Sequence, residues 1–404
     1  MRTRFNFQLL LLLCVITISL RAQDTTALVQ NDTAQRLLMN EQPVFPAVGD
    51  IAPPLRVRWL KGEPVQQFEK GHVYVVEFWA TWCRPCVAAM PHLSSLANQY
   101  KDKVTIIGID VFESNHPEKV KTFVDSAGRR MDYHVAVEDS NFMQTDWLAA
   151  TADMGIPRSF VIDTDGKIAW IGHPKLGLAE TLQKVVNNTW NPKDALAKWK
   201  TERYLDSLNF EIGFTLAGYI HNHGDATDTQ MGDSILLMIN ELVRKEPGLK
   251  YKPVIAGSTF NALIKTDLRK AYEYGKEIMT SSDNPDYHII FNTIRAYENK
   301  INLPPEMYQL GIDAYQGRID AWPESADYPE FYHQMADWYW RTNQKSKAIT
   351  TEQKAIEAVK SRKYFTKHDT VSLAEFQTRL QQYKELSKRK LPAFQSGFQQ
   401  YKEL

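Results

Sequence analysis

The ten residues Glu77-Phe-Trp-Ala-Thr-Trp-Cys83-Arg-Pro-Cys86 place two cysteines three positions apart, directly after a nearly continuous apolar run. That run, from Val73 to Ala80, predicts a buried β-strand. A helix is expected from Arg84 to about Tyr100, because alanines and leucines recur along one of its faces. The cysteine pair therefore lies at the junction between a buried strand and a helix, and this strand–helix unit is the starting point for predicting the fold.

The spacing of the two cysteines suits a redox centre. It places both sulfurs on the same side of the first helical turn, close enough to form a disulfide. The free N–H groups and partial positive charge of a helix N-terminus stabilise a thiolate, which is the nucleophile in disulfide exchange. Pro85 fits this first turn because it lacks a donor where none is needed, and Arg84 adds a nearby cation. Cys83 is the expected nucleophile and Cys86 the resolving thiol.

Strand and helix signals alternate around this pair, from about Gly49 to Trp190. Further strands are expected at 104–111, 133–137, 159–163 and 168–171, and further helices at 117–127, 142–154 and 178–188. An Asp-Gly turn within residues 164–167 predicts that the last two strands form a hairpin. Strands that alternate with helices and end in a hairpin indicate an α/β sandwich around a mixed sheet.

After Trp190 the strand signals almost vanish, and the rest of the chain is expected to be helical. Residues 332–355 resemble one tetratricopeptide repeat, because small residues such as Ala336 and Ala348 recur among aromatic ones. Weaker fragments of this pattern occur at irregular spacing, and Glu352 stands where an aromatic residue is usual. The pattern predicts an all-α helical-hairpin domain and leaves membership of the tetratricopeptide repeats open.

The N-terminus has the form of a secretory signal peptide. Arg2 and Arg4 precede an apolar run from Leu9 to Leu20 that is too short to span a bilayer comfortably, and cleavage is expected near Ala22. An uncleaved membrane anchor is the alternative. The expected product is a soluble periplasmic or otherwise exported protein without stable membrane insertion. The expected parts are a signal peptide (1–22), a flexible leader (23–47), an α/β domain (48–190) and an α-helical domain (191–404).

Cysteine usage and charge narrow the function further. Cys14 would leave with the signal peptide, so the mature chain keeps only the Cys83/Cys86 pair. Exported proteins that rely on disulfides for stability usually carry several pairs, which favours chemistry as the role of this one. Lys plus Arg and Asp plus Glu both number 48, so no excess of charge favours a nucleic acid or an anionic membrane as partner.

Three segments carry a resemblance to a known family. The Cys83/Cys86 segment is preceded by Val48-Gly-Asp-Ile-Ala-Pro-Pro-Leu55 and followed by Met154-Gly-Ile-Pro157-Arg-Ser-Phe-Val-Ile-Asp163. In order and spacing they resemble the TlpA/ResA-like thiol–disulfide oxidoreductases of the thioredoxin superfamily, over residues 48–190. The resemblance implies a thioredoxin-like fold, an enzyme of thiol–disulfide exchange, and no cofactor beyond the redox-active disulfide Cys83–Cys86.

The same resemblance assigns roles around the cysteines. It implies that Pro157 is cis and faces the cysteines, so that the backbone of Ile156 can pair with a client strand. Trp82 is expected to screen the sulfurs and to contact the substrate. The implied partners are client proteins with disulfides and a membrane or periplasmic thiol electron donor, with the protein acting as a reductase.

Glu77 is a carboxylate within an otherwise apolar strand, where burial without a partner is costly. The resemblance places it where thioredoxins carry a buried acid behind the second cysteine. Desolvation should raise its pKa, which makes it a candidate proton shuttle for Cys86. The alternative is a structural role, because the longer Glu side chain can reach solvent or another partner.

Other functions compete with this interpretation. A zinc site needs about four ligands, and the mature chain has no further cysteine. A purely structural disulfide over so short a loop would add little stability. A peroxiredoxin-like thiol peroxidase shares the Val-Gly-Asp opening, and Thr81 stands two residues before Cys83, but the segment Trp82-Cys-Arg-Pro-Cys86 fits such an enzyme badly. Finally, the helical half could be a client-binding module to which the redox domain is an accessory.

Overall fold

The computed structural model describes residues 46–148, 155–223, 227–281, 285–322, 328–361 and 367–388. The expected signal peptide and nearly all of the expected leader lie outside these residues. Within the described parts, no helix is long and apolar enough to cross a membrane. The chain divides into two compact units, residues 1–262 and 263–404, and each is described separately below.

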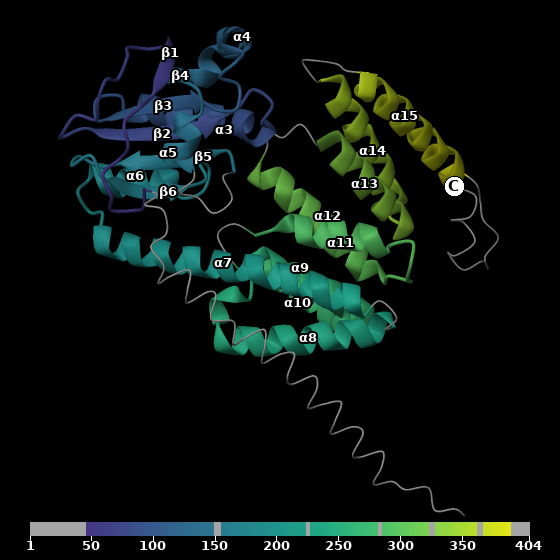
Figure 1. Cartoon of the computed structure of the whole chain (residues 1–404). Helices are drawn as coiled ribbons and strands as arrows, with labels where there is room; N and C mark the ends of the chain where they lie inside the picture. Colours follow the sequence, from purple (N-terminus) through teal and green to yellow (C-terminus); the bar gives the residue numbers. More distant parts are fainter. Residues whose placement is uncertain are drawn as a thin grey trace, which may run out of the picture. The chain divides into compact units, whose positions relative to one another are not determined.

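The first unit contains a six-stranded mixed sheet (Figure 1). Its strands are β1 (Val57–Lys61), β2 (Val73–Trp79), β3 (Val104–Asp110), β4 (His134–Glu138), β5 (Arg158–Ile162) and β6 (Ile168–Gly172). Their order in the sheet is β1-β4-β3-β2-β5-β6, with β2, β3 and β4 parallel and the other pairings antiparallel. The central strand β2 is buried along its whole length, as its apolar sequence predicts.

Helices cover both faces of this sheet. Val75 and Trp79 of β2 share a hydrophobic core with α3, α4 and α6, whereas Val76 and Phe78 share another with α5. This explains why β2 reads as a continuous apolar run instead of an alternating one. The bounds of the covering helices are α3 (Arg84–Gln99), α4 (Pro117–Ala127), η1 (Gly128–Met131), α5 (Phe142–Asp146) and α6 (Leu178–Val186).

Two elements differ from the sequence-based expectation. The helix expected over 142–154 is regular only to Asp146, and residues 149–154 lie outside the described parts of the chain. Strand β1 was not expected. It pairs with β4 at the edge of the sheet, and polar residues such as Arg58 and Lys61 make its sequence too polar to indicate a strand.

The first unit continues into the helices α7 (Pro192–Asn222) and α8 (Asp228–Lys245), a short η3 (Pro247–Leu249) and most of α9 (Pro253–Thr266). The last residues of α9, from Leu263 onward, belong to the second unit. Helix α7 begins where the Asn191 side chain accepts hydrogen bonds from two backbone N–H groups of its first turn. Its next turns bring Leu196 and Trp199 against the sheet core that contains Phe78. The start of the helical region is therefore part of the packing of the sheet.

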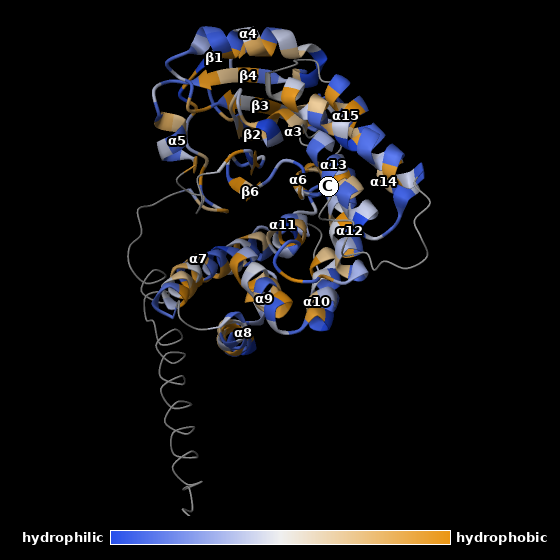
Figure 2. Cartoon of the chain, turned by 90° about the vertical axis from the view of Figure 1, so that its right-hand side faces the viewer, coloured by the Kyte–Doolittle hydropathy of each residue, from blue (hydrophilic) through white to orange (hydrophobic). Residues whose placement is uncertain are grey.

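The described residues of the second unit are helical and contain no strand. Their helices are α10 (Leu268–Thr280), α11 (Tyr287–Tyr297), α12 (Pro305–Ala321), α13 (Tyr328–Arg341), α14 (Lys345–Lys360) and α15 (Lys367–Lys388). Figure 2 shows hydrophobic and hydrophilic residues in alternating patches along these helices, as amphipathic packing requires. The predicted fold class, a thioredoxin-like α/β sandwich followed by an all-α region, is confirmed.

The segment that resembles a tetratricopeptide repeat forms the consecutive helices α13 and α14. Ala336 and Ala348 are buried between aromatic side chains, as the small-residue pattern predicts. Glu352, the departure from the repeat pattern, is buried and its Oε1 lies 2.8 Å from Nδ1 of His333. A polar pair thus occupies the position of an aromatic contact, and a tetratricopeptide classification stays a prediction.

Candidate redox active site

Cys83 caps the N-terminus of α3, after a short loop that follows strand β2. Its Sγ is bonded to Sγ of Cys86 at 2.02 Å, and it accepts a hydrogen bond of 3.3 Å from the backbone N–H of Cys86. Pro85 occupies the first turn, and no acidic residue lies there. A thiolate at Cys83 would receive the free N–H groups and the positive end of the helix without opposing charge.

The two cysteines differ in exposure. Cys86 is fully buried, whereas Cys83 keeps 4 % of its surface exposed. The neighbouring Trp82 is 59 % exposed, so it lies at the rim of the site and does not fill the core. Cys83 is thus the more exposed of the two cysteines, and its role as the attacking thiol stays a prediction.

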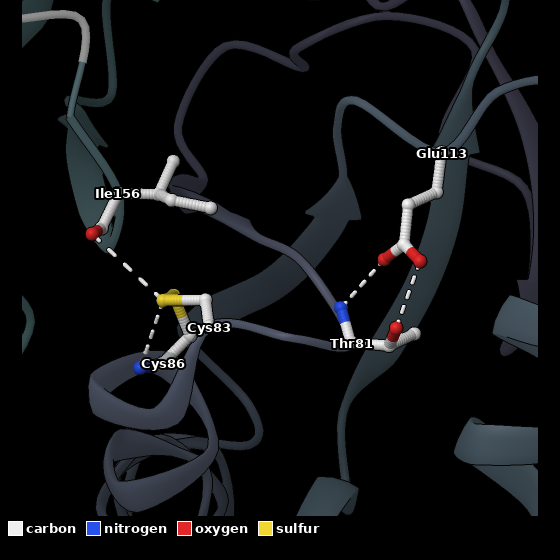
Figure 3. The surroundings of a disulfide bond; sticks show 5 residues. All are labelled: Thr81, Cys83, Cys86, Glu113 and Ile156. Carbon is white, nitrogen blue, oxygen red and sulfur yellow. Dashed lines mark hydrogen bonds between the residues drawn. A yellow bond between two sulfur atoms is a disulfide. The ribbon is translucent and has the colours of Figure 1, made fainter.

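Ile156 and Pro157 approach Cys83 from the start of β5. The peptide bond between them is cis, as the family resemblance implied. The carbonyl oxygen of Ile156 lies 3.8 Å from Sγ of Cys83 (Figure 3). In the disulfide this is a contact only, because the sulfur has no proton, but a reduced Cys83 thiol could donate a hydrogen bond there. Pairing of Ile156 with a client strand stays a prediction.

Glu77 lies in the middle of β2, between Gly108 of β3 and Ser159 of β5. It is only 1 % exposed, and within the described chain neither carboxylate oxygen has a hydrogen-bond partner. Burial raises its pKa from 4.5 to about 8. By strand alternation its side chain shares the sheet face of Val75 and Trp79, whose core includes Cys86.

Other buried polar groups without a described partner surround Glu77. They are the Trp79 Nε1, the Tyr133 hydroxyl and the Ser159 hydroxyl. Gly108 leaves room for them, since a Cβ there would come within 2.9 Å of the Tyr133 ring. Burial, together with the nearby Glu77, raises the pKa of Tyr133 well above its usual value. Such a patch of unpaired donors and acceptors is suited to internal water.

A cluster formed by Asp110, Glu113 and Lys119, which the sequence analysis did not predict, fixes the loop before Cys83. The backbone N–H and the hydroxyl of Thr81 donate to the two carboxylate oxygens of Glu113, at 2.6 and 2.8 Å (Figure 3). Nζ of Lys119 lies 2.5 Å from the same carboxylate. Glu113 therefore fixes the backbone two residues ahead of the nucleophile.

Asp110 is the third member of this cluster and is buried. Burial, and then the charge of Glu113, raises its pKa to about 9. Burial alone would raise the pKa of Glu113 too, but hydrogen bonds from Lys119 and Thr81 hold it below its usual value. The sequence did contain a signal, because Asp110 ends a buried strand parallel to β2 and Glu113 follows it. Parallel strands end at the same sheet edge, and the loop after β2 carries Cys83.

These features define the class of protein. A disulfide at a helix N-terminus, beside a cis-proline and on a mixed sheet of this order, characterises a thioredoxin-fold dithiol–disulfide protein. Comparison with known protein families supports this class. The model of the AhpC/TSA family matches residues 48–171, which leaves the helices from α6 onward outside the match.

Individual relatives narrow the class. Protein FixW of Rhizobium leguminosarum is 32 % identical over 150 residues, which cover 35 % of this chain and 67 % of FixW. The thiol:disulfide interchange protein HelX of Rhodobacter capsulatus is 30 % identical over 145 residues, covering 35 % of this chain and 73 % of HelX. The thiol-disulfide oxidoreductase ResA of Bacillus anthracis is 35 % identical over 124 residues, covering 30 % and 66 %.

The chain belongs to the family of thiol–disulfide oxidoreductases that includes HelX and ResA. It spans about two thirds of the length of FixW and ResA. Solved structures with a similar unit include a thiol-disulfide isomerase from Corynebacterium glutamicum (22 % identity, TM-score 0.28, 33 % of this chain and 96 % of that one). StoA from Bacillus subtilis is another (18 % identity, TM-score 0.28, 33 % and 98 %).

Proposed function

We propose that this protein is an exported reductase that transfers electrons from its Cys83/Cys86 dithiol to the disulfides of client proteins. The position of Cys83 carries this proposal. Its sulfur caps α3 and is bonded to that of the fully buried Cys86, and Cys83 is the more exposed residue of the pair. This arrangement gives one thiol access to a client and reserves the other for release.

The first step is attack on the client. The Cys83 thiolate attacks one sulfur of the client disulfide, so that a mixed disulfide forms and the other client sulfur leaves as a thiolate. The helix N-terminus lowers the free energy of the attacking thiolate. Backbone pairing with Ile156, beside the cis Pro157, would align the client, and Trp82 would line the contact.

The second step releases the client. Cys86 loses its proton and attacks Sγ of Cys83, which restores the internal disulfide and frees the second client thiolate. Glu77 is the proposed acceptor of the Cys86 proton. Its pKa of about 8 is close to that of an ordinary thiol, so the proton can move between them with little change in free energy. The polar groups around Glu77 offer a path for it.

A reductase must be reduced again after each turnover. The proposed donor is a membrane or periplasmic thiol protein that returns two electrons and two protons to the Cys83–Cys86 disulfide. Export rests on the sequence of residues 1–22 alone, so it needs its own test. Fractionation of cells, with N-terminal sequencing of the mature protein, would find an exported chain that begins shortly after Ala22; a cytoplasmic chain that retains Met1 would contradict export.

A redox titration of the cysteine pair tests the direction of transfer. A potential near that of thioredoxin, about −270 mV, would support a reductase, whereas one near −120 mV would indicate an oxidase. The match to the AhpC/TSA family makes peroxide reduction the second candidate function. Parallel assays of insulin reduction and peroxide consumption separate the two. Faster peroxide consumption would overturn the proposed function.

A further inference from the structure

Phe112 adopts a backbone conformation that a bulky residue rarely takes. Its φ is 71°, in the left-handed region that favours glycine. Its N–H donates a 2.9 Å hydrogen bond to Oε1 of the buried Glu138, and the side-chain amide of Gln144 donates to the same oxygen. The surrounding structure thus holds Phe112 in a conformation that disfavours it.

Within the described residues, the Phe112 side chain makes few contacts that could offset the free energy of this backbone conformation. The Phe112 side chain is 43 % exposed, so much of its apolar surface stays in contact with water. Its ring lies beside that of Trp82, with centroids 6.2 Å apart and planes inclined by 39°. A strained residue whose side chain remains exposed points to a role in binding.

The location of this aromatic pair suggests what it binds. Trp82 directly precedes Cys83, and Phe112 directly precedes Glu113, which holds Thr81. Figure 3 shows Ile156 beside Cys83 and Glu113 beside Thr81, at the two ends of the loop from Thr81 to Cys83. A client chain that crosses Cys83 and meets Ile156 can therefore also contact the aromatic pair, because Trp82 is the residue next to Cys83.

We propose that Phe112 and Trp82 form a specificity subsite that accepts an apolar client side chain next to the client's cysteine. This proposal rests on the proposed disulfide reduction and adds a preference among clients to it. Two exposed rings offer an apolar contact without a charge or a buried donor to satisfy. An aliphatic or aromatic side chain is therefore favoured over a small polar one.

The test compares two peptide disulfides that differ only in the residue beside the cysteine, leucine in one and serine in the other. The full-length protein is pre-reduced, and the second-order rate constant for each peptide is measured by stopped flow. We expect the leucine peptide to react roughly 5- to 15-fold faster, from burial of one aliphatic side chain on two rings. In Phe112→Ala this ratio should fall below about 2.

Two further variants separate binding from folding. Phe112→Gly removes the ring and relieves the left-handed backbone, so it should lose the ratio while unfolding at a higher temperature than Phe112→Ala. Phe210→Ala removes an exposed phenylalanine from α7 and should keep the wild-type ratio. A merely structural Phe112 would instead restore the ratio in Phe112→Gly along with stability.

The outcomes distinguish this inference from the proposed function. If the wild-type protein reduces both peptides at equal rates, or Phe112→Ala keeps the leucine preference, the subsite is overturned and disulfide reduction stands. If the reduced protein reacts with neither peptide, the proposed function itself fails.

Discussion

Glu77 and Asp110 are buried acids on the neighbouring strands β2 and β3, yet their surroundings differ. Glu77 has no described hydrogen-bond partner, and burial alone accounts for its raised pKa. Asp110 owes its higher pKa first to burial and then to repulsion by Glu113. Both should be mostly protonated at neutral pH, so neither imposes a full buried charge on the resting fold. The smaller, ionised fraction of Glu77 is the form that can accept the Cys86 proton.

Replacing Glu77 with glutamine should change how stability depends on pH. Because the folded pKa of about 8 exceeds the ordinary 4.5, the folded state binds more protons than the unfolded state between these values. Stability of the wild type should therefore fall as pH rises from about 4.5 to 8, by up to a few kcal/mol. Denaturant unfolding across this range should show a shallower decline in Glu77→Gln.

A matched control for this measurement is Glu118→Gln, which changes an exposed carboxylate on α4. Its stability should follow the wild type across the pH range. Asp110 contributes to the same decline and remains in both variants, so the slope should be reduced and not abolished. Parallel curves for Glu77→Gln and wild type would show that Glu77 does not titrate as its burial requires.

The difference between the two thiols is also a residue-scale prediction. In the reduced protein, Cys83 should react with iodoacetamide at least tenfold faster than Cys86, because it caps the helix and is less buried. Mass spectrometry of peptides after timed quenching measures both rates. The variants Cys83→Ser and Cys86→Ser assign each signal, and equal rates near neutral pH would contradict the assigned nucleophile.

At the scale of elements, the sequence predicts what local pattern determines. The apolar run of β2, the helix after Cys83 and the Asp-Gly hairpin all lie where periodicity and turn residues place them. The cis bond at Pro157 was available only through family resemblance. What the sequence did not show depends on contacts between elements: β1 gains its place by pairing with β4, and Glu113 acts on a loop 32 residues away.

The two hydrogen bonds from Thr81 to Glu113 connect the loop before Cys83 to the segment that follows β3. The variant Glu113→Gln should weaken this connection. The amide of glutamine has one acceptor oxygen, so it cannot accept both Thr81 hydrogen bonds and the Lys119 ion pair as the carboxylate does. We expect a loss of about 1–3 kcal/mol in stability. The backbone amide of Thr81 should also exchange with deuterium roughly tenfold faster or more.

Glu118→Gln again serves as the control, since it alters α4 without touching Thr81. If exchange at Thr81 is equally slow in Glu113→Gln and wild type, Glu113 is not what holds this loop. If exchange rises equally throughout the sheet, the variant has lost global stability, and the faster exchange at Thr81 is not a local effect of the lost Glu113 hydrogen bonds.

At the scale of the whole molecule, the first helices of the helical region belong to the same unit as the sheet and the cysteine pair, called the redox unit below. Trp199 of α7 packs against the sheet core opposite the face of α3. Trp199→Ala should therefore destabilise the unit by about 1–3 kcal/mol, because it removes apolar contacts from a partly buried site. Urea unfolding measures this loss, and Phe210→Ala on the same helix should change stability by less than about 0.5 kcal/mol.

This packing changes how the role of the remaining helices should be tested. A chain cut after Trp190 would lose Leu196 and Trp199 from the sheet core, so any defect could reflect misfolding. A chain that ends at Thr266 keeps α7, α8 and α9 complete and removes α10 to α15. If the first unit unfolds at the same temperature in this truncated chain and in the full-length chain, the truncation has not disturbed the fold around the cysteines.

The last prediction asks whether α10 to α15 select clients. In Cys86→Ser the resolving thiol is absent, so attack by Cys83 should stop at the mixed disulfide and covalent client adducts should accumulate. In the native organism we expect a small, reproducible set of adducts, identified by mass spectrometry after capture under non-reducing conditions. Cys83→Ser,Cys86→Ser is the control that forms none.

Combining Cys86→Ser with truncation at Thr266 should leave reaction with small model disulfides within about twofold, because the redox unit is intact. The set of trapped clients should nevertheless shrink or change, since tethered binding helices raise the effective concentration of particular clients near Cys83. Local contacts at Ile156 and at the aromatic pair would then be the only selection that remains. An unchanged set of adducts would show that α10 to α15 do not choose clients and serve assembly or another partner instead.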